Sequence, residues 1–354
     1  MSWRECRLGD LMRLQRGHDL PAQNRQDGEV PVVSSSGITG YHSKAKAAAP
    51  GVVTGRYGTL GEVFFLDRDY WPLNTALYVT DFKGNDPKFS AYFLRYVLKD
   101  YQSDKAAVPG IDRNVLHELK VRAPDIALQL RVVNLLDAYD DLIDNNRRRI
   151  KLLEDSVRLL FDEWFVRLQF PGHAPAAPAT RMPAGWSRVP LDEVLVLQRG
   201  FDLPSQDREA GDVPIYGSTG IVGFHNKAKV TGPGLVTGRS GTLGDVHFVA
   251  QDFWPLNTAL WVKEFKRATP LFALHLLRSM NLGQYNGGVS VPTLDRKVVH
   301  RAEVPLPPAS MIERFESIAD DVYRQINTLT EMNRKLRAAR DLLLPRLMSG
   351  ELVA

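Results

Sequence analysis

The sequence predicts an α/β (α+β) fold with two homologous α/β domains separated by two long helices that pack as an antiparallel coiled coil. Two observations support this prediction. The first is a tandem repeat, because residues 14–77 match residues 197–260 at 40 of 64 positions without a gap. The second is a helical pattern of apolar residues after each copy. The repeat period of 183 residues far exceeds the roughly 20–50 residues of a solenoid unit, so each copy should be a domain of its own.

Composition limits the class of protein. The chain has 354 residues, of which 44% are hydrophobic and 24% charged, as expected for two or three domains with packed cores. There is no membrane-length apolar run and no signal-peptide pattern, so we expect a cytoplasmic protein with no membrane partner. The only cysteine is Cys6, which excludes intrachain disulfides and Cys-rich zinc sites, and no metal site is expected. A net charge of +4 permits a nucleic-acid partner without requiring one.

The first copy, residues 1–124, has the pattern of a strand-rich α/β domain. Short β-branched or aromatic runs, separated by Gly, Pro, Asn and Asp, predict strands at 30–33, 51–54, 63–66 and 76–79. Residues 89–98 have one apolar face and predict a helix. The second domain is expected over residues 186–307, by the same repeat.

Apolar residues at steps of three and four predict a long helix at 125–168 and another at 308–350. A Pro- and Ala-rich stretch, 169–185, predicts a semi-extended linker between the first helix and the second domain. The predicted seam of the first helix is Leu128, Val132, Leu135, Tyr139, Leu142, Asn146, Ile150, Leu153, Val157, Leu160 and Trp164. The predicted seam of the second is Phe315, Ile318, Val322, Ile326, Leu329, Leu336, Leu343 and Leu347.

Two asparagines, Asn146 and Asn333, interrupt these seams near the middle of each helix. A buried asparagine at such a position fixes the register of a coiled coil. A solvated position on a slightly rotated helix is the alternative.

Three local motifs carry a resemblance to a known family. They are GRYGTLG at residues 55–61, DEWF at 162–165 and LLLPRLMSGEL at 342–352, the last being the most specific. With its two α/β repeats and two long helices, nearly the whole chain resembles the specificity subunit of type I restriction-modification systems. The resemblance implies two target-recognition domains, each recognising half of a split DNA site, related by a pseudo-twofold axis.

The resemblance also implies partners. The helices would act as a ruler between the half-sites and as a platform for two modification subunits, which carry the adenine methyltransferase, bind S-adenosylmethionine and can recruit restriction and translocase subunits. This chain itself would bind no cofactor. The residues expected at the partner contacts are Trp164, Phe165, Leu344, Arg346 and Leu347.

The sequence lacks the motifs of catalytic subunits, as this interpretation requires. It has no phosphate-binding Gly-x-x-x-x-Gly-Lys-Ser/Thr loop, no Asn/Asp-Pro-Pro-aromatic tetrapeptide of amino-methyltransferases and no His-Glu-x-x-His. We therefore expect a non-catalytic subunit with no catalytic residues.

The repeated glycine-rich turn presents Arg56 in the first copy and Arg239 in the second, followed by Tyr57 and Ser240. The planar arginine fork suits both phosphate and the O6/N7 edge of guanine. The alternative is a tight structural turn in which the arginine pairs internally.

Other repeated positions are DNA-binding candidates, mainly through the resemblance. The repeated lysines suit phosphate neutralisation or a merely solvated edge, and the two asparagines suit base contacts or turn capping. A polar loop at 103–109 and 286–292 is the third region expected to border DNA. The candidates are Arg16, His18, Lys44, Lys46, Asn74, Lys105, Arg113, Arg199, Phe201, Lys227, Lys229, Asn257, Ser290 and Arg296.

Two other classes of function fit the same sequence. One is a stand-alone DNA-binding or architectural protein that works without a methyltransferase partner. The other is a protein-interaction scaffold. Copurification of a methyltransferase separates the first from the specificity subunit, and salt-dependent DNA binding separates both from the scaffold.

Overall fold

The computed structural model describes residues 3–57, 61–99, 110–172, 182–288 and 292–352. The chain divides into two compact units, which we treat separately. Unit 1 comprises Met1–Asn145 and Met332–Ala354, and unit 2 comprises Asn146–Glu331. Both units therefore contain a part of each long helix, α4 (Ile126–Phe161) and α8 (Ala309–Ser349). The sequence predicts a different division, into consecutive recognition domains, long helices and a linker. Those boundaries stay a prediction.

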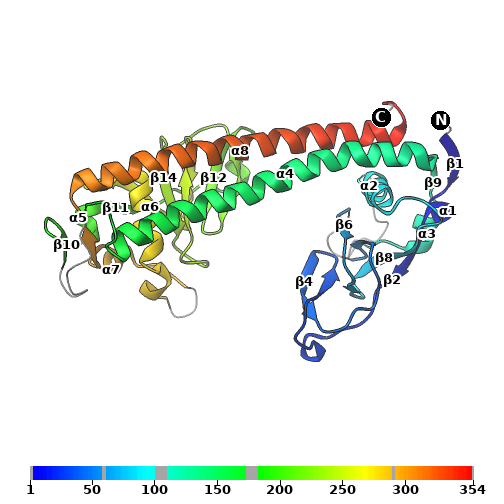
Figure 1. Cartoon of the computed structure of the whole chain (residues 1–354), viewed down its shortest axis with the longest axis horizontal. Helices are drawn as coiled ribbons and strands as arrows, with labels where there is room; N and C mark the ends of the chain where they lie inside the picture. The colour runs from blue at the N-terminus through cyan, green and yellow to red at the C-terminus, as the bar shows by residue number, and fades with distance from the viewer. Residues whose placement is uncertain (1–2, 58–60, 100–109, 173–181, 289–291, 353–354) are drawn as a thin grey trace. The chain divides into compact units, whose positions relative to one another are not determined.

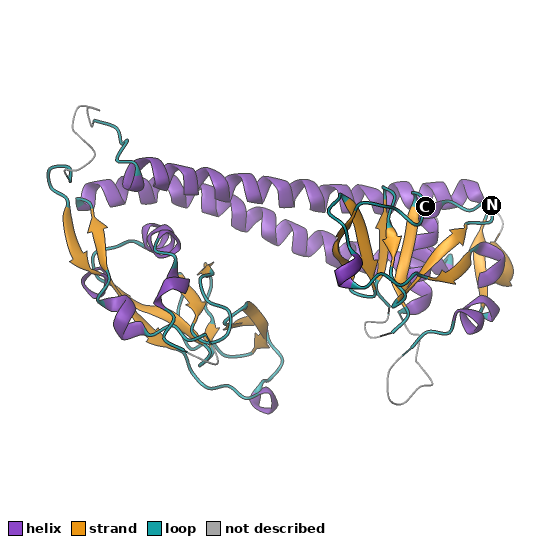
Figure 2. Ribbon diagram, turned by 90° about the horizontal axis from the view of Figure 1, so that it is seen from below, coloured by secondary structure: helices purple, strands orange, loops and turns teal. Residues whose placement is uncertain are grey.

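Unit 1 has an antiparallel four-stranded sheet of order β2-β8-β5-β6, a three-stranded sheet of order β4-β3-β7 and the pair β1-β9 (Figures 1 and 2). Apart from α4 and α8, its elements are β1 (Trp3–Arg7), α1 (Leu8–Leu11), β2 (Arg13–Arg16), η1 (Ala22–Asn24), β3 (Val30–Ser34), β4 (Gly37–His42), β5 (Gly51–Gly55), β6 (Val63–Leu66), β7 (Trp71–Pro72), β8 (Ala76–Asp81), α2 (Pro87–Leu98), α3 (Arg113–Glu118) and β9 (Lys120–Pro124).

Unit 2 repeats this topology with sheets β11-β17-β14-β15, β13-β12-β16 and β10-β18. Its elements are η2 (Asp162–Val166, a π-helical turn), β10 (Ser187–Pro190), α5 (Leu191–Val194), β11 (Leu195–Arg199), η3 (Ser205–Asp207), β12 (Val213–Gly217), β13 (Gly220–His225), β14 (Gly234–Gly238), β15 (Val246–Val249), β16 (Trp254–Pro255), β17 (Ala259–Phe265), α6 (Pro270–Ser279), η4 (Leu282–Tyr285), α7 (Arg296–His300) and β18 (Glu303–Leu306).

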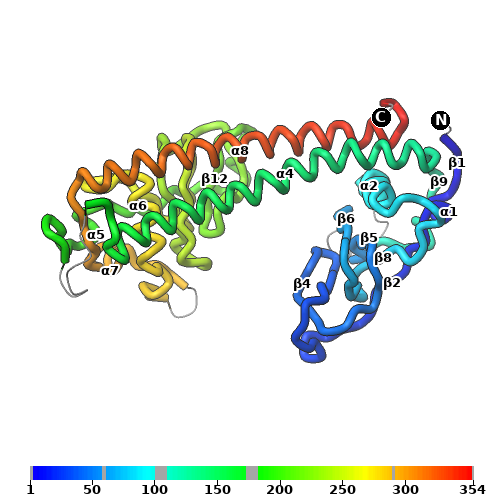
Figure 3. Tube along the Cα trace, in the orientation of Figure 1, coloured from blue at the N-terminus to red at the C-terminus, as the bar shows by residue number. Residues whose placement is uncertain are grey.

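Parts of the two long helices pack together in each unit, as the sequence predicts. In unit 1 the beginning of α4 runs beside the end of α8 (Figure 3). The two segments contribute to one hydrophobic cluster, through Leu128, Val132 and Leu347 among others. In unit 2 the end of α4 and the beginning of α8 share another, through Phe161 and Phe315. Early residues of one helix thus meet late residues of the other, which is an antiparallel arrangement.

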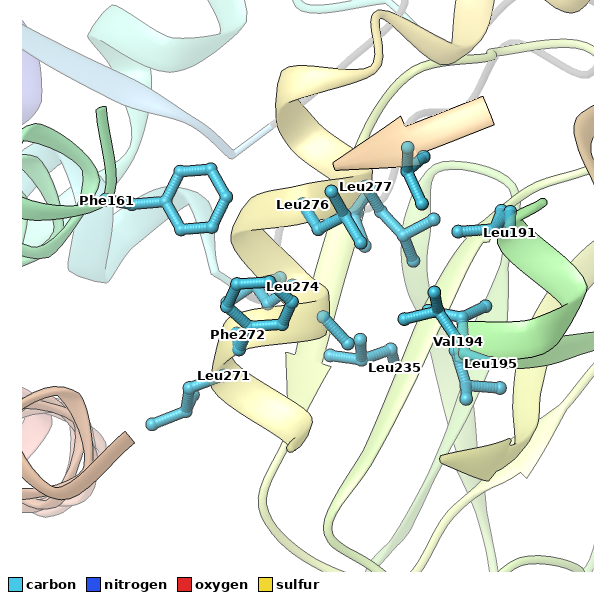
Figure 4. Packing of buried hydrophobic residues seen from close by; sticks show 14 of the residues in the cluster. Phe161, Leu191, Val194, Leu195, Leu235, Leu271, Phe272, Leu274, Leu276 and Leu277 are labelled. Atoms are coloured by element: carbon cyan, nitrogen blue, oxygen red, sulfur yellow. The ribbon is translucent and has the colours of Figure 1, made fainter. Parts of the chain in front are cut away.

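The domain helix of each unit lies between its sheet and the long helices. Figure 4 shows this for α6, whose Phe272 faces Phe161 of α4 while Leu276 and Leu277 lie toward Leu191 on the sheet side. The Phe161 and Phe272 ring centroids are 5.7 Å apart. Helix α2 occupies the same place in unit 1 and shares a cluster with strand and long-helix residues. Each sheet is therefore anchored to the long helices through one short helix.

Polar contacts fix the same junction. In unit 2 the Glu316 carboxylate accepts hydrogen bonds at 3.0 Å from the backbone amides of Leu271 and Phe272 and at 2.7 Å from the Thr269 hydroxyl. A carboxylate at a helix N-terminus satisfies amides that lack an intrahelical partner. In unit 1 the side chain of Gln129 accepts from the amide of Asp86, the N-cap of α2, at 3.1 Å. A residue of α8 thus holds the start of α6, and a residue of α4 holds the start of α2.

Three predicted seam positions are wrong. Leu135, Leu142 and Ile318 are 38%, 49% and 41% exposed, whereas Leu136, Ile143 and Ala319, the next residue in each case, are buried. A strict alternation of three and four residues places the seam one position early, because α2 and α6 also pack against the long helices and shift the buried face.

Both asparagines are buried, which decides between the two alternatives given by the sequence. Asn146 is 3% and Asn333 5% exposed. Within unit 1, Asn333 donates from Nδ2 to the carbonyl oxygen of Ile143, 3.2 Å away. A buried amide in an apolar seam favours the one register in which its hydrogen bonds are made.

Candidate nucleic-acid interface

Three arginines that are distant in sequence line one pocket of unit 1. Arg16, Arg56 and Arg113 surround a space of about 200 Å³ together with Tyr57, Leu77, Ile111 and Asp112. Arg16 and Arg113 are exposed, and Arg56 is half-buried. The pocket carries three positive charges against the single negative charge of Asp112, a net charge of +2.

The ends of secondary-structure elements place the three arginines. Arg16 is the last residue of β2, whose partner in β8 is Leu77. Arg56 follows β5 directly, and its carbonyl accepts a 2.9 Å hydrogen bond from the amide of Ile111. That bond brings the segment before α3 to the pocket, and the Asp112 side chain caps α3 by accepting from Asn114. Arg113 begins α3 at this edge.

Close backbone approach at Gly17 sets the orientation of the strand end. A Cβ at this position would lie 2.2 Å from the carbonyl oxygen of Leu73, and one at Gly200 would lie 2.3 Å from that of Leu256. No larger side chain fits at that distance, so glycine is required for packing here. The strand end that carries Arg16 or Arg199 thus lies against the turn before β8 or β17.

Unit 2 forms an equivalent pocket, displaced by 183 residues in the sequence. Arg199, Arg239 and Arg296 take the places of the three arginines, and Leu260, Leu294 and Asp295 take those of Leu77, Ile111 and Asp112. Lys297, Gly287 and Thr293 complete the lining of a larger space of about 380 Å³. Three arginines and Lys297 against Asp295 give a net charge of +3.

The two pockets differ at the residue after the glycine-rich turn's arginine. In unit 1 the Arg56 guanidinium lies over the Tyr57 ring, 4.4 Å from its centroid, and its Nη2 donates to the Tyr57 hydroxyl at 3.1 Å. In unit 2 Ser240 replaces Tyr57, and Arg239 donates from Nη1 to the carbonyl oxygen of Asn257 at 3.2 Å. Both arginines thus pair internally, as the structural alternative given by the sequence expects, one through Tyr57 and the other through a backbone carbonyl. Each guanidinium has five N–H donors, so a DNA contact through the others stays a prediction.

Lysine and aromatic side chains gather beside each pocket at the turn after Arg16 and Arg199. In unit 1 the Lys46 ammonium lies 5.9 Å from the Trp71 ring centroid, and the His18 ring approaches Trp71 edge-on at 6.4 Å. In unit 2 the Lys229 ammonium lies 5.2 Å from the Phe201 ring and 5.7 Å from the Trp254 ring. Lys46 and Lys229 thus have aromatic neighbours, and all four lysines (Lys44, Lys46, Lys227 and Lys229) are exposed.

The substitution of His18 by Phe201 changes the chemistry of this turn. Burial lowers the pKa of His18, and the neighbouring Lys46 ammonium lowers it further by disfavouring a second positive charge. A neutral imidazole can donate from one nitrogen and accept at the other, so at neutral pH His18 is suited to a hydrogen bond rather than to phosphate neutralisation. Phe201 offers an apolar ring instead.

The remaining DNA-binding candidates divide into two groups. Asn74 and Asn257 donate through Nδ2 to the carboxylates of Asp19 and Asp202 in the same relative positions, so both amides already have partners. Lys105 and Ser290 lie outside the described residues.

The residues expected at partner contacts lie mostly inside the hydrophobic cores. Trp164 and Phe165 are 7% and 5% exposed, and Leu344 and Leu347 are 8% and 2% exposed. Only Arg346 is exposed, and it pairs with Glu351 at 2.9 Å. Because these four apolar side chains are buried, they could support a partner site only indirectly, by holding the ends of the long helices in place.

Sequence reasoning missed Lys297, and it did not foresee that the three arginines of each copy meet. Lys297 has no basic counterpart, because the residue 183 positions earlier is Asn114. The matching pairs Asp112-Arg113 and Asp295-Arg296 were the one sequence feature that indicated a third arginine at the same place in both copies. Each pair is a helix N-cap followed by a first-turn arginine.

Comparison with known proteins decides the family. The signature of the family described as "Type I restriction modification DNA specificity domain" matches residues 1–155 and again residues 183–337. The chain belongs to this family. The repeat found in the sequence is thus a duplicated specificity domain, in a family that forms a non-catalytic component of restriction-modification complexes.

Two curated relatives and one solved structure agree with this assignment. The chain is 23% identical over 283 residues to the type I restriction enzyme MjaIX specificity subunit of Methanocaldococcus jannaschii, covering 72% of this chain and 65% of that protein. It is 25% identical over 144 residues to the EcoprrI specificity subunit of Escherichia coli, covering 39% and 36%. The chain thus spans less than two thirds of the length of either relative.

The solved S subunit of a type I restriction-modification system from M. genitalium has the same fold. The TM-score is 0.60 at 16% identity, over 98% of this chain and 96% of that one. This likeness confirms the predicted fold class of two repeated α/β domains with long helices packed together.

Within the described part of the chain, no group of three or more His, Cys, Asp or Glu side chains is placed to hold a metal ion. None of the described helices is both long and apolar enough to cross a membrane.

Proposed function

We propose that this chain is the sequence-specific DNA-recognition subunit of a type I restriction-modification complex. The observation that carries the proposal is the pair of arginine pockets at equivalent positions of the two domains. Arg56 and Arg239 each present a fixed fork beside two further arginines, a chemistry that suits the O6/N7 edge of guanine and the flanking phosphates. Each domain recognises one half of a bipartite double-stranded DNA target.

The target is nearly palindromic in this proposal. The domains share 40 of 64 positions over the core of the repeat, so their recognition surfaces are alike. A pseudo-twofold relation between similar domains matches an inverted repeat, as symmetric dimeric repressors match palindromic operators. The differences between the half-sites follow from the residues that differ, chiefly Tyr57 against Ser240 and His18 against Phe201.

The long helices dock two adenine-methyltransferase modification subunits and, through them, the restriction subunits. Exposed apolar residues on α4 and the following turn η2 support this part of the proposal. In unit 2, Leu152, Leu159 and Val166 recur every seven residues and are 69%, 50% and 58% exposed. In unit 1, Leu135 and Leu142 are also seven residues apart and are 38% and 49% exposed. Seven residues are about two helical turns, so each set lies on one face. S-adenosylmethionine binds to the modification subunits, and the complex acts in the cytoplasm, where DNA is accessible.

Coexpression with a modification subunit tests the proposal against the two alternatives. We expect the two proteins to copurify, and we expect DNA affinity to fall steeply with salt because bound lysines and arginines release counterions. The chain alone should show no methyltransferase, ATPase or nuclease activity. Methyl transfer by the purified chain without a partner would contradict the proposal. Salt-dependent DNA binding without copurification would favour a stand-alone DNA-binding protein, and the absence of both would favour a scaffold.

A further inference from the structure

One exposed apolar surface recurs in both units and has no role in the pockets. On β4 it consists of Ile38 and Tyr41, each 53% exposed. On β13 it consists of Ile221, Val222 and Phe224, which are 52%, 41% and 53% exposed. We call these two surfaces the apolar hairpin edges. Single exposed apolar residues are common on protein surfaces, but the same cluster at equivalent positions of two domains indicates a shared role.

Each apolar hairpin edge is an edge strand with the same irregularity. β4 and β13 lie at the ends of the sheets β4-β3-β7 and β13-β12-β16. The strand pairing shifts register in both hairpins, and Gly40 and Gly223 take φ values of +146° and +157°. This bulge turns the strand, so that residues three apart are both exposed.

Cations flank both surfaces. Lys44 and Lys46 follow β4 closely, and Arg25 lies across the strand, with Nη1 donating to the carbonyl oxygen of Thr39 at 3.0 Å. Lys227 and Lys229 follow β13 in the same way. The Nη1 of Arg208 lies 3.5 Å from where a Cβ of Gly223 would be. Apolar side chains between cations fit a polyanion that also has an apolar surface.

In unit 2 the turn that begins the apolar hairpin edge lies close to the glycine-rich turn. The turn between β12 and β13 lies against the glycine-rich turn, because a Cβ on Gly238 would lie 3.0 Å from the carbonyl oxygen of Ser218. Gly238 directly precedes Arg239 in the sequence. The β12–β13 turn, which leads into Ile221, therefore lies next to the strand end that leads into Arg239.

We propose that the apolar hairpin edges lie against the bases and sugars of the DNA duplex, while the flanking lysines and arginines bind phosphates. This inference rests on the proposed function and extends it to residues that make apolar contacts. Tyr41 and Phe224 occupy equivalent positions and share an aromatic ring, but only Tyr41 carries a hydroxyl. The ring itself is therefore the contact. A second copy of this surface would bring like charges together, which disfavours self-association as the reason for the exposure.

The test is DNA binding by full-length Tyr41→Ser and Phe224→Ser variants. The probe is a duplex that the wild-type chain selects from a random-sequence pool. Each variant should bind about tenfold more weakly, the scale of losing the burial of about half of one large apolar side chain. The slope of log affinity against log salt should stay unchanged, because an apolar contact releases no counterions, whereas removing Lys46 and Lys229 together should reduce it by about 2.

Matched controls complete the design. Tyr41→Phe and Phe224→Tyr should bind as the wild type does, and so should Leu130→Ser, which removes a similarly exposed apolar residue (46%) from α4. Unchanged affinity of both serine variants would overturn the inference while leaving the proposed function intact. The inference would also be overturned if the serine variants bound DNA normally but no longer copurified with the modification subunit. That result would assign the surface to a protein partner. If the wild-type chain selected no sequence and bound DNA without salt dependence, the proposed function and this inference would both fall.

Discussion

Replacing Arg56 and Arg239 together by alanine is expected to abolish selective DNA binding while leaving the fold intact. A bidentate contact to a base is worth about 1–3 kcal/mol of discrimination. Because the two arginines lie in separate pockets, their effects should add to about 2–6 kcal/mol. At about 1.4 kcal/mol for each factor of ten, selectivity for the target should fall by a factor of roughly 30 to 10⁴.

The measurement is equilibrium binding to target and scrambled duplexes, with thermal melting as the control for folding. Arg56→Lys and Arg239→Lys are the matched variants. They keep the charge but lose the planar fork, so they should retain non-specific affinity while losing much of the selectivity. If the alanine variants melted early but bound normally once folded, the arginines would be structural residues of the turn.

Phe315→Ala is expected to destabilise unit 2 by about 3–5 kcal/mol, the usual cost of truncating a fully buried phenylalanine. Phe315 is 0% exposed. Its ring packs against Phe161 at 5.7 Å, Phe165 at 5.3 Å and His275 at 5.9 Å between ring centroids. These neighbours come from α4, η2 and α6, whereas Phe315 itself is on α8, so the cavity would weaken the junction between the domain and the long helices.

Ile318→Ala provides the control on the same helix. Ile318 lies three residues further on and is 41% exposed, so its truncation should cost less than about 1 kcal/mol. Urea denaturation of both variants measures the difference. Equal destabilisation would show that Ile318 belongs to the buried seam, as the heptad pattern predicts and the structure contradicts.

The repeat made most of the fold predictable. It showed two domains, and its Gly- and Pro-punctuated runs placed the strands β3, β5, β6 and β8 and the helix α2 to within a few residues. The faces of the long helices were less predictable. A sequence pattern for two packed helices contains no information on α2 and α6, which also lie against α4 and α8 and shift the buried face by one residue at Leu135, Leu142 and Ile318.

The candidate site was predictable as a set of residues but not as an arrangement. Arg16, Arg56 and Arg113 are far apart in sequence, and only the pairing of β2, β5 and β8 together with the bond from Ile111 to Arg56 brings them to one pocket. The repeat indicated which arginines to compare. It could not reveal Lys297, which lacks a basic counterpart, or the stacking of Arg56 on Tyr57.

Mapping of methylated adenines in cells that carry this chain with a modification subunit tests the central claim most directly. The account predicts one split motif that appears only when this chain is present. Its two halves should be similar inverted sequences separated by a fixed gap, with one methylated adenine on each strand. No chain-dependent adenine methylation would contradict the assignment of a DNA-recognition subunit. Two wholly unrelated half-sites would contradict the claim that the paired arginine pockets perform the same recognition.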